Sequence, residues 1–517
     1  RYSTITEEYE LSNTIDLSLS NDDNFGYSLS TDYYGDTVII GTPDQNYDGS
    51  TENWGYTYVY DRIVQNLEAQ YTSLTYVPQL FTLAWTPSTT AITVTASDAT
   101  LDRFTCASSS SLTIGDPVVF SGTVFGGIAV STVYYILAKP TGTTFTISTE
   151  RSGTILPLNN GSGSMTATQQ DTPLYVSVNG TLINDSTYFN VGSTITIIQG
   201  LNAGDIITVS GNNFVLAQTL TTENTPRIGV QFGTSVDTNT YATEILVGAP
   251  FELNSIAQEG AVYRYTNGGG KYGMIIGTTD TNITTTRSIL INGYMVVLTV
   301  GNATVAAAAI NQANITNLQA TSIDGKLIIS LLDNALASPN NKLNVSVLDT
   351  ATWVELGINT YTQTQTINDP HIQGTTQFGN IVKFNEFNSF VVSAPTATRY
   401  QATTFDSTDD EDYDNDTLFD NNTTQWIDTY RNAGAVYMFD YLSVYNESLT
   451  NCGNFVYAQS TNDINETYGS QPMYGHAVEF NNSHVVIGTP NFKPDTVAGQ
   501  VVTYFNSTGT PDWSVYR

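Results

Sequence analysis

A short acidic stretch carries oxygen-bearing side chains at the spacing that a calcium ion requires. The ligand candidates are Asp44, Asn46, Asp48 and Glu52. Carboxylate and amide oxygens at alternate positions of a tight loop are the ligands that Ca²⁺ prefers, and Gly49 permits the sharp turn between them. The spacing predicts a calcium-binding loop, with a solvated acidic turn as the alternative.

A second stretch, much farther along the chain, repeats this chemistry. Its candidates are Asp412, Asp414, Asp416 and Asp420, which are all hard oxygen donors. Thr417 stands where a glycine would ease the turn, so this pattern is less regular than the first. A solvated acidic loop is again the alternative. Ca²⁺ is the one cofactor that the sequence suggests.

The other reactive residues form no catalytic constellation. His371, His476 and His484 lack the spacing of zinc ligands. Neither a G-x-S-x-G elbow, a phosphate-binding loop nor a dinucleotide fingerprint occurs. A carboxylate pair for glycoside hydrolysis is a spatial feature, and with 48 acidic residues a pair could always be named. We therefore expect a protein that is not an enzyme.

The elements that position these residues come from a pattern that occurs four times. An aromatic-Gly pair is followed by an apolar run that ends in a Gly/Ser-small-Pro triplet, 14 to 16 positions after the aromatic residue. A later glycine then opens a strand rich in Val and Tyr. The pairs are Phe25-Gly26, Phe232-Gly233, Phe378-Gly379 and Tyr474-Gly475; the triplets are Gly41-Thr42-Pro43, Gly248-Ala249-Pro250, Ser393-Ala394-Pro395 and Gly488-Thr489-Pro490; the strand-opening glycines are Gly55, Gly260, Gly434 and Gly499.

Each copy reads as a small sheet packed between two others. The run before the triplet is apolar on both faces, as a strand covered on both sides must be, and Pro ends it because Pro cannot donate to the ladder. The glycine after the aromatic residue lets neighbouring backbones approach closely. These residues resemble the FG-GAP repeat, known from the integrin α-subunit head and from many bacterial and viral surface proteins.

The resemblance implies a β-propeller with calcium-binding loops. Such rings usually have seven blades, whereas four copies are found here, so the ring contains degenerate blades or is completed by residues outside this chain. The loops around Asp44 and Asp412 follow the Pro triplet, whereas the integrin calcium loop precedes it. The expected fold class is all-β: a complete or partial propeller of FG-GAP-type blades with inserted small β domains and one small α+β domain.

The spacing of the copies predicts where the insertions lie. The opening aromatic residues are 96 to 207 positions apart, and a blade needs only about 40–50 residues. Residues 112–120 resemble small β modules of phage tail and fibre proteins, as residues 175–180 do less specifically. A helix with a capping Thr is expected at 304–312 and a hairpin at 289–298. The predicted units are propeller blade(s) 1–91, an inserted β module 92–168, a second β module 169–213, a blade 214–273, an α+β domain 274–362, and blades 363–517 with an acidic loop 396–433.

Composition restricts the partners. The formal charge of −32 repels nucleic acid and anionic lipid. No apolar run approaches the roughly 20 residues that span a bilayer, so membrane insertion is not expected. Two cysteines cannot provide a disulfide framework. A homo-oligomer is compatible with the sequence, but no heptad pattern supports a particular symmetry.

These features together predict a virion structural protein of a phage-like virus. A tail, fibre or surface-appendage component at the virion surface would contact other virion proteins or a protein or glycan of the host. The first alternative is an extracellular or cell-surface adhesin with calcium-dependent protein or glycan binding. The distant alternative is a polysaccharide depolymerase, which would need two carboxyl groups roughly 5–9.5 Å apart in a groove.

Overall fold

The computed structural model describes most of the chain, and its architecture confirms the all-β class. Strands make up 54% and helices 5%, and the strands form many separate antiparallel sheets. The described residues are 2–3, 8–9, 14–15, 23–46, 54–72, 78–87, 89–151, 153–170, 175–184, 187–222, 229–254, 257–268, 273–332, 343–369, 375–385, 389–397, 399–404, 424–430, 434–443, 446–455, 475–480, 484–493, 498–506 and 513–516.

Four sheets, here called repeat sheets 1 to 4, each contain one copy of the sequence repeat. In each, four consecutive elements of the repeat pair antiparallel in the same order. Sheet 1 contains β3 (Ser28–Thr31), β4 (Thr37–Thr42), β5 (Tyr56–Glu68) and β17 (Ile206–Leu220); sheet 2 contains β18 (Ser235–Thr238), β19 (Glu244–Ala249), β22 (Ala261–Asn267) and β31 (Tyr361–Asn368); sheet 3 contains β32 (Val382–Phe384), β33 (Phe390–Ala394), β36 (Ala435–Ser443) and β37 (Asn446–Phe455); sheet 4 contains β38 (Ala477–Phe480), β39 (His484–Lys493), β40 (Ala498–Asn506) and β41 (Trp513–Tyr516).

Repeat sheets 1, 2 and 3 stack through the same glycine contact. A Cβ atom added to Gly41 of sheet 1 would lie 2.0 Å from the carbonyl oxygen of Gly233, in the Phe-Gly pair that opens sheet 2. A Cβ added to Gly248 of sheet 2 would lie 1.9 Å from the carbonyl oxygen of Gly379, which opens sheet 3. At these two contacts the glycine of the triplet is required because the next sheet's backbone occupies the space of a side chain, whereas sheet 3 has Ser393 at the equivalent position.

The opening aromatic residue fills the space between neighbouring sheets. Phe232 packs edge-to-face on Tyr263 and Tyr265 of its own sheet, with ring centroids 5.4 and 6.3 Å apart. Phe378 packs edge-to-face on Phe439 at 6.3 Å and in a tilted arrangement on Tyr437 at 5.6 Å. These rings are almost completely buried, and aromatic pairs of this geometry stabilise a core beyond the area they bury.

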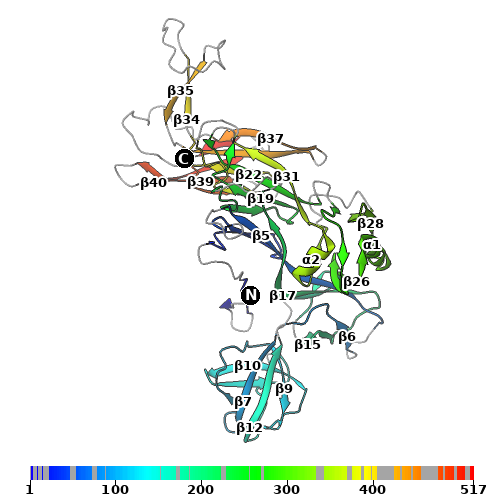
Figure 1. Ribbon diagram of the computed structural model, residues 1–517. Helices are drawn as coiled ribbons and strands as arrows, with labels where there is room; N and C mark the ends of the chain where they lie inside the picture. Colours follow the sequence, from blue (N-terminus) through cyan, green and yellow to red (C-terminus); the bar gives the residue numbers. More distant parts are fainter. Residues whose placement is uncertain are drawn as a thin grey trace.

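Both large insertions leave the repeat sheets at the same connection, between the third and fourth strands. Residues 69–205 separate β5 from β17, and residues 268–360 separate β22 from β31. Because stacked sheets with the same strand order present this connection at the same end, both insertions lie at one end of the stack (Figure 1). The hairpin β34 (Arg399–Thr404) and β35 (Thr424–Tyr430) joins the second and third strands of sheet 3 and projects at the opposite end.

The first insertion contains a closed barrel of six strands. Its core is built from buried rings that include Phe104, Phe120 and Phe145. Its first and last strands pair with each other, so the chain enters and leaves at adjacent positions. The strands are β7 (Thr89–Asp98), β8 (Arg103–Cys106), β9 (Pro117–Gly122), β10 (Val133–Thr141), β11 (Thr144–Ser148) and β12 (Gly161–Gln170).

The second predicted module, 169–213, is not a separate unit in the structure. The last part of β17 pairs with the first part of β5 within repeat sheet 1. The first part of β17 pairs with the end of β5 on one side and with β13 (Tyr175–Val178) on the other. β14 (Thr181–Leu182) adds an edge to this sheet, and β15 (Tyr188–Val191) and β16 (Thr194–Ile197) form a sheet with β6 (Gln79–Thr82). Strands from both predicted units, 1–91 and 169–213, are therefore interleaved in one body.

The second insertion combines sheets with two helices, of which the sequence predicted one. The predicted hairpin at 289–298 is confirmed as β25 and β26, and the predicted helix at 304–312 as α1. The capping residue is Asn302 rather than the expected Thr, because the Asn302 Oδ1 accepts hydrogen bonds from the backbone N–H groups of Thr304 and Val305. The elements are β23 (Met274–Ile276), β24 (Asn282–Ile283), β25 (Arg287–Ile291), β26 (Tyr294–Leu298), β27 (Gly301–Asn302), α1 (Ala303–Gln312), β28 (Leu318–Ile323), β29 (Lys326–Leu331), β30 (Val345–Val347) and α2 (Thr350–Leu356).

Candidate binding sites around the first repeat sheet

Asp44 lies in a turn that the repeat itself builds. The backbone N–H of Gln45 donates to Thr42, and the Gln45 carbonyl accepts from Trp54 and Gly55, at 3.1 to 3.3 Å. Sheet 2 has the same turn, in which the Glu252 carbonyl accepts a hydrogen bond from the backbone N–H of Gly260, the strand-opening glycine of that sheet, at 3.1 Å. The backbone that holds Asp44 is therefore a feature of the fold.

The Asp44 carboxylate links two repeat sheets. It accepts one hydrogen bond from the side-chain amide of Asn24 and another from that of Gln231, the latter at 3.3 Å. Asn24 and Gln231 precede the Phe-Gly pairs of sheets 1 and 2, and both have left-handed backbone angles, with φ of 52° and 54°. Two amide donors thus already engage the carboxylate that the sequence predicted as a calcium ligand.

The other predicted ligands are only partly described. The Oδ1 atom of Asn46 is buried and accepts no hydrogen bond from the described residues. Asp48, Glu52 and all four candidates of the second loop lie outside the described residues. Within the described part of the chain, no three His, Cys, Asp or Glu side chains gather closely enough to hold a metal ion. Calcium binding stays a prediction.

A row of polar residues that the sequence analysis missed follows the first strands of the four repeat sheets. Ser30, Asp237, Lys383 and Glu479 each stand five positions after the opening aromatic residue of a repeat. The Ser30 hydroxyl donates to Asp237 at 2.6 Å, and the Lys383 ammonium lies 3.8 Å from the same carboxylate. The backbone N–H of Phe384 donates to its other oxygen at 2.6 Å.

This row joins repeat sheets 1, 2 and 3 through one carboxylate. Burial raises the pKa of Asp237, while the Lys383 charge and the hydrogen bond from Ser30 lower it. Because Asp237 is nearly inaccessible to solvent, its satisfied hydrogen bonds indicate a structural link and not a catalytic acid. The constant position of these residues, five after the opening aromatic residue, is the sequence signal that could have identified the row.

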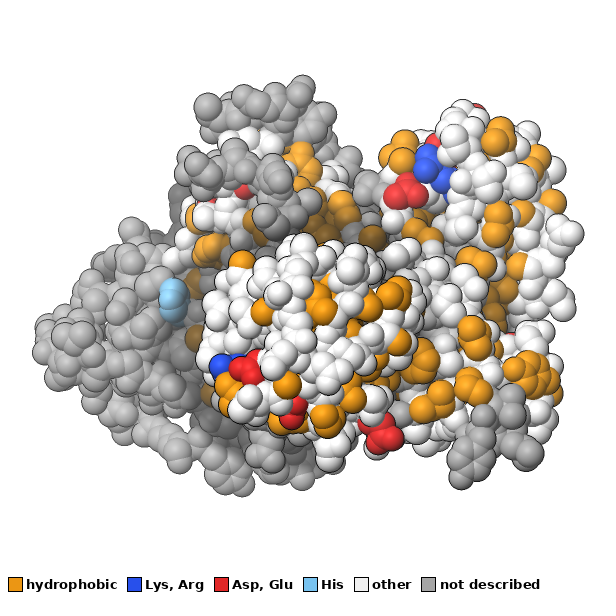
Figure 2. All heavy atoms as spheres, turned by 90° about the horizontal axis from the view of Figure 1, so that it is seen from below, with side chains coloured by type: hydrophobic (Ala, Val, Ile, Leu, Met, Phe, Trp, Pro, Cys, Tyr) orange, Lys and Arg blue, Asp and Glu red, His pale blue; other side chains and the backbone are white. Residues whose placement is uncertain are grey.

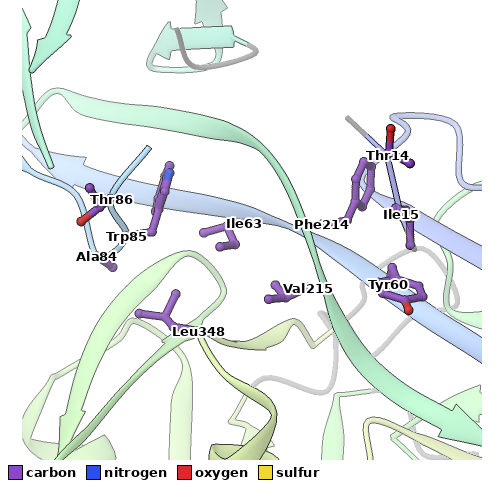
Figure 3. A pocket seen from close by; sticks show the side chains of 10 residues that line it. All are labelled: Thr14, Ile15, Tyr60, Ile63, Ala84, Trp85, Thr86, Phe214, Val215 and Leu348. Atoms are coloured by element: carbon purple, nitrogen blue, oxygen red, sulfur yellow. The ribbon is translucent and has the colours of Figure 1, made fainter. Parts of the chain in front are cut away.

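An open pocket of about 510 Å³ lies where sheet 1 meets both insertions. Figure 3 shows Trp85 at one side of it, Phe214 and Tyr60 at the other, and Ile63 between them. Its described lining contains no acidic, basic or histidine side chain. The lining residues are Thr14, Ile15, Tyr60, Ile63, Ala84, Trp85, Thr86, Phe214, Val215 and Leu348.

A charged pair supports the aromatic side of this pocket from behind. The Arg62 guanidinium lies 4.4 Å from the centroid of the Phe214 ring, and its Nε is 3.2 Å from Asp36. The Tyr175 hydroxyl donates to the same carboxylate at 3.5 Å, and burial, together with the Asp36 charge, raises the pKa of Tyr175 to about 12. The ring of Phe214 is thereby held in place by a cation–π contact.

The described lining of the pocket offers aromatic rings and hydroxyl groups but no carboxylate, imidazole, amine or thiol. Its indole and phenyl rings with neighbouring threonine hydroxyls suit a flat, partly apolar ligand such as a sugar ring or an aromatic side chain.

Of the three histidines, His476 is exposed on sheet 4, His484 begins β39, and His371 lies outside the described residues.

Charged side chains are few on the described surface at the insertion end. Figure 2 views this end and shows apolar side chains distributed among uncharged polar ones, with isolated charged groups.

No helix among the described residues has both the length and the apolar character needed to cross a membrane. A scan against models of known protein families found no match to this chain, and a search of curated proteins found none either.

Proposed function

We propose that this chain is a structural component of a phage-like virion, in a tail, fibre or other surface appendage. In this proposal the repeat sheets are blades of an FG-GAP-like β-propeller, and the insertions are modules that contact neighbouring virion proteins or a host surface. The observation that carries the proposal is the repeated glycine contact, which joins successive sheets into one scaffold bearing both insertions at the same end.

The form of the insertions supports a role in contact. The barrel enters and leaves at paired strands, so it extends from the scaffold without interrupting it. The surface at that end is mixed and weakly charged, as protein interfaces commonly are. The aromatic pocket between scaffold and insertions is suited to a glycan or an aromatic side chain of a partner.

The direct test is mass spectrometry of purified virions and of cell envelopes from the source. Peptides of this chain recovered with capsid and tail proteins from the particles would establish the structural role. Recovery only from envelopes would overturn it and would favour the adhesin. Washing the particles at high salt before digestion separates incorporated chains from adsorbed ones.

A further inference from the structure

An open groove of about 260 Å³ lies between the last part of β17 and helix α2, which are neighbours in Figure 1. It shares no described lining residue with the pocket beside Trp85. Four consecutive residues of the strand, 216–219, form one wall, and the helix and the turn after it contribute Trp353, Val354 and Ile358 to the other. The described lining carries no acidic or basic side chain.

The strand meets this groove with its edge. Side chains alternate between the two faces of a strand: Leu216 packs with the cluster around Tyr58 on one face, and Ala217 with the core shared with sheet 2 on the other. A groove that contacts both residues must therefore run along the strand edge. From residue 214 to residue 220, β17 pairs with β5 alone, because its described pairing with β13 ends at Ser210.

The register shows which backbone groups of this edge point towards the groove. Along an antiparallel strand, successive residues direct their backbone N–H and C=O groups to opposite sides. The backbone N–H of Arg62 in β5 donates to Asp36 on the β4 side at 2.7 Å, so Tyr58, four positions earlier, points to that side as well. Its register partner Thr219 therefore directs its backbone groups away from β5. Leu216, which pairs with the residue two positions after Tyr58, does the same.

These outward groups are open. The described residues provide no hydrogen-bond partner for the outward N–H and C=O groups of Leu216 and Thr219. Helix α2 stands beside the edge without closing it, since Val354 is 76% exposed. An open strand edge of this kind is a template for another strand.

We propose that the groove binds an extended segment of a partner protein, which adds one strand to the edge of β17. The backbone of the segment pairs with the outward groups of Leu216 and Thr219, and one of its apolar side chains enters the space beside Val354. A peptide backbone matches this edge because it offers donors and acceptors at the spacing of a strand, which a sugar ring does not. Since the described lining is uncharged and the chain has a formal charge of −32, we expect segments without acidic residues.

Three variants separate the edge from its surroundings. Thr219→Pro removes one outward N–H and leaves the ladder with β5 intact, and proline is tolerated at such edge positions. Thr366→Pro is the matched control in sheet 2: both threonines are exposed, and each pairs with the tyrosine three positions after the strand-opening glycine of its sheet. Val354→Lys blocks the helix side of the groove without any proline. Circular dichroism and melting temperature verify that each variant is folded.

The probe is a displayed library of short random peptides, selected on the whole chain. We expect the wild type and Thr366→Pro to bind the selected peptides equally, and Thr219→Pro and Val354→Lys to bind them about tenfold more weakly. Amide hydrogen exchange then reports backbone pairing: bound peptide should slow exchange at Leu216 and Thr219 and leave Gln218, which faces β5, unchanged.

Three results would overturn the proposal: a library that yields no binding peptide, peptides that bind all variants equally, or binding that leaves exchange at Leu216 and Thr219 fast. Slow exchange at both amides in the free chain would overturn it as well, because the edge would then be occupied already, by this chain or by a second copy.

That the partner is a neighbouring virion protein rests on the proposed function, whereas the binding of a peptide does not. Peptide binding by a chain that is absent from virions would remove the virion assignment alone. A chain found in virions that binds no peptide would remove the groove proposal alone.

Discussion

At the residue scale, the Asp44 carboxylate serves as a cross-link between repeat sheets 1 and 2, through the amides of Asn24 and Gln231. We predict that Asp44→Ala lowers the free energy of unfolding by about 1 kcal/mol in the presence of a chelator, since the carboxylate is half-buried and its loss leaves two amides unpaired. Urea unfolding measures the change. An unchanged midpoint would show that the cross-link contributes nothing.

The calcium prediction is tested at positions apart from this cross-link. We expect millimolar Ca²⁺ to raise the melting temperature of the wild type, and the double variant Asp48→Asn/Glu52→Gln to lose that rise while keeping the melting temperature measured in chelator. The four aspartates of the second loop, changed to Asn, form the parallel test. A wild type whose melting temperature is the same with and without Ca²⁺ contradicts calcium binding at both loops.

At the scale of elements, the stacking of repeat sheets 1 to 3 depends on the triplet glycine. We predict that Gly248→Ala costs at least about 3 kcal/mol, because the new methyl group would lie 1.9 Å from the Gly379 carbonyl and the two sheets would have to separate. Gly142→Ala in the barrel is the control, since an added Cβ there meets nothing within 4 Å. The melting temperatures of the two variants test this prediction. Equal melting temperatures for Gly248→Ala and Gly142→Ala would contradict the stacking argument.

An ion pair joins helix α2 to strand β25, and it makes the second insertion sensitive to acid. Arg287 donates two hydrogen bonds to Glu355, at 2.9 and 3.0 Å, and with Thr284 it lowers the pKa of Glu355 to about 2. The folded-state pKa lies below the ordinary value of 4.5, so the stabilisation is complete above that value and is lost as the pH falls towards 2.

The measurement is the melting temperature of the wild type and of Glu355→Gln between pH 7 and pH 2.5. We expect the wild type to be the more stable at pH 7 and the difference to shrink steadily below about pH 5. Glu150→Gln, an exposed position in the barrel, controls for the general effect of removing a carboxylate. A difference that does not change with pH would contradict the assignment to Glu355.

At the scale of the whole molecule, the barrel is attached in a way that predicts its independence. Thr89 and Gln170 are register partners at the two ends of the barrel, and its core residues form a cluster of their own. We predict that residues 89–170 fold alone with a cooperative thermal transition. We also predict that replacing them by a short Gly/Ser linker leaves the remaining chain folded. Loss of solubility or of cooperative unfolding in either piece would contradict this independence.

The sequence by itself determined the elements whose signals are local. The strands of the repeat follow from apolar runs, a closing proline and glycines at constant offsets, and α1 follows from an alanine-rich run. Helix α2 was missed because its seven residues include β-branched Thr and Val; it is held instead by the Asp349 cap and by Gly357 in a left-handed conformation.

Only the tertiary structure decided how distant segments combine. β5 and β17 pair along most of their length although the insertion separates them in sequence, so 169–213 could not be recognised as part of the body begun in 1–91. The engagement of Asp44 by Gln231, and of Asp237 by Ser30 and Lys383, likewise joins residues far apart in the chain. Strand pairing and buried polar contacts are selected by the whole packed arrangement, and local residue patterns carry no record of their partners.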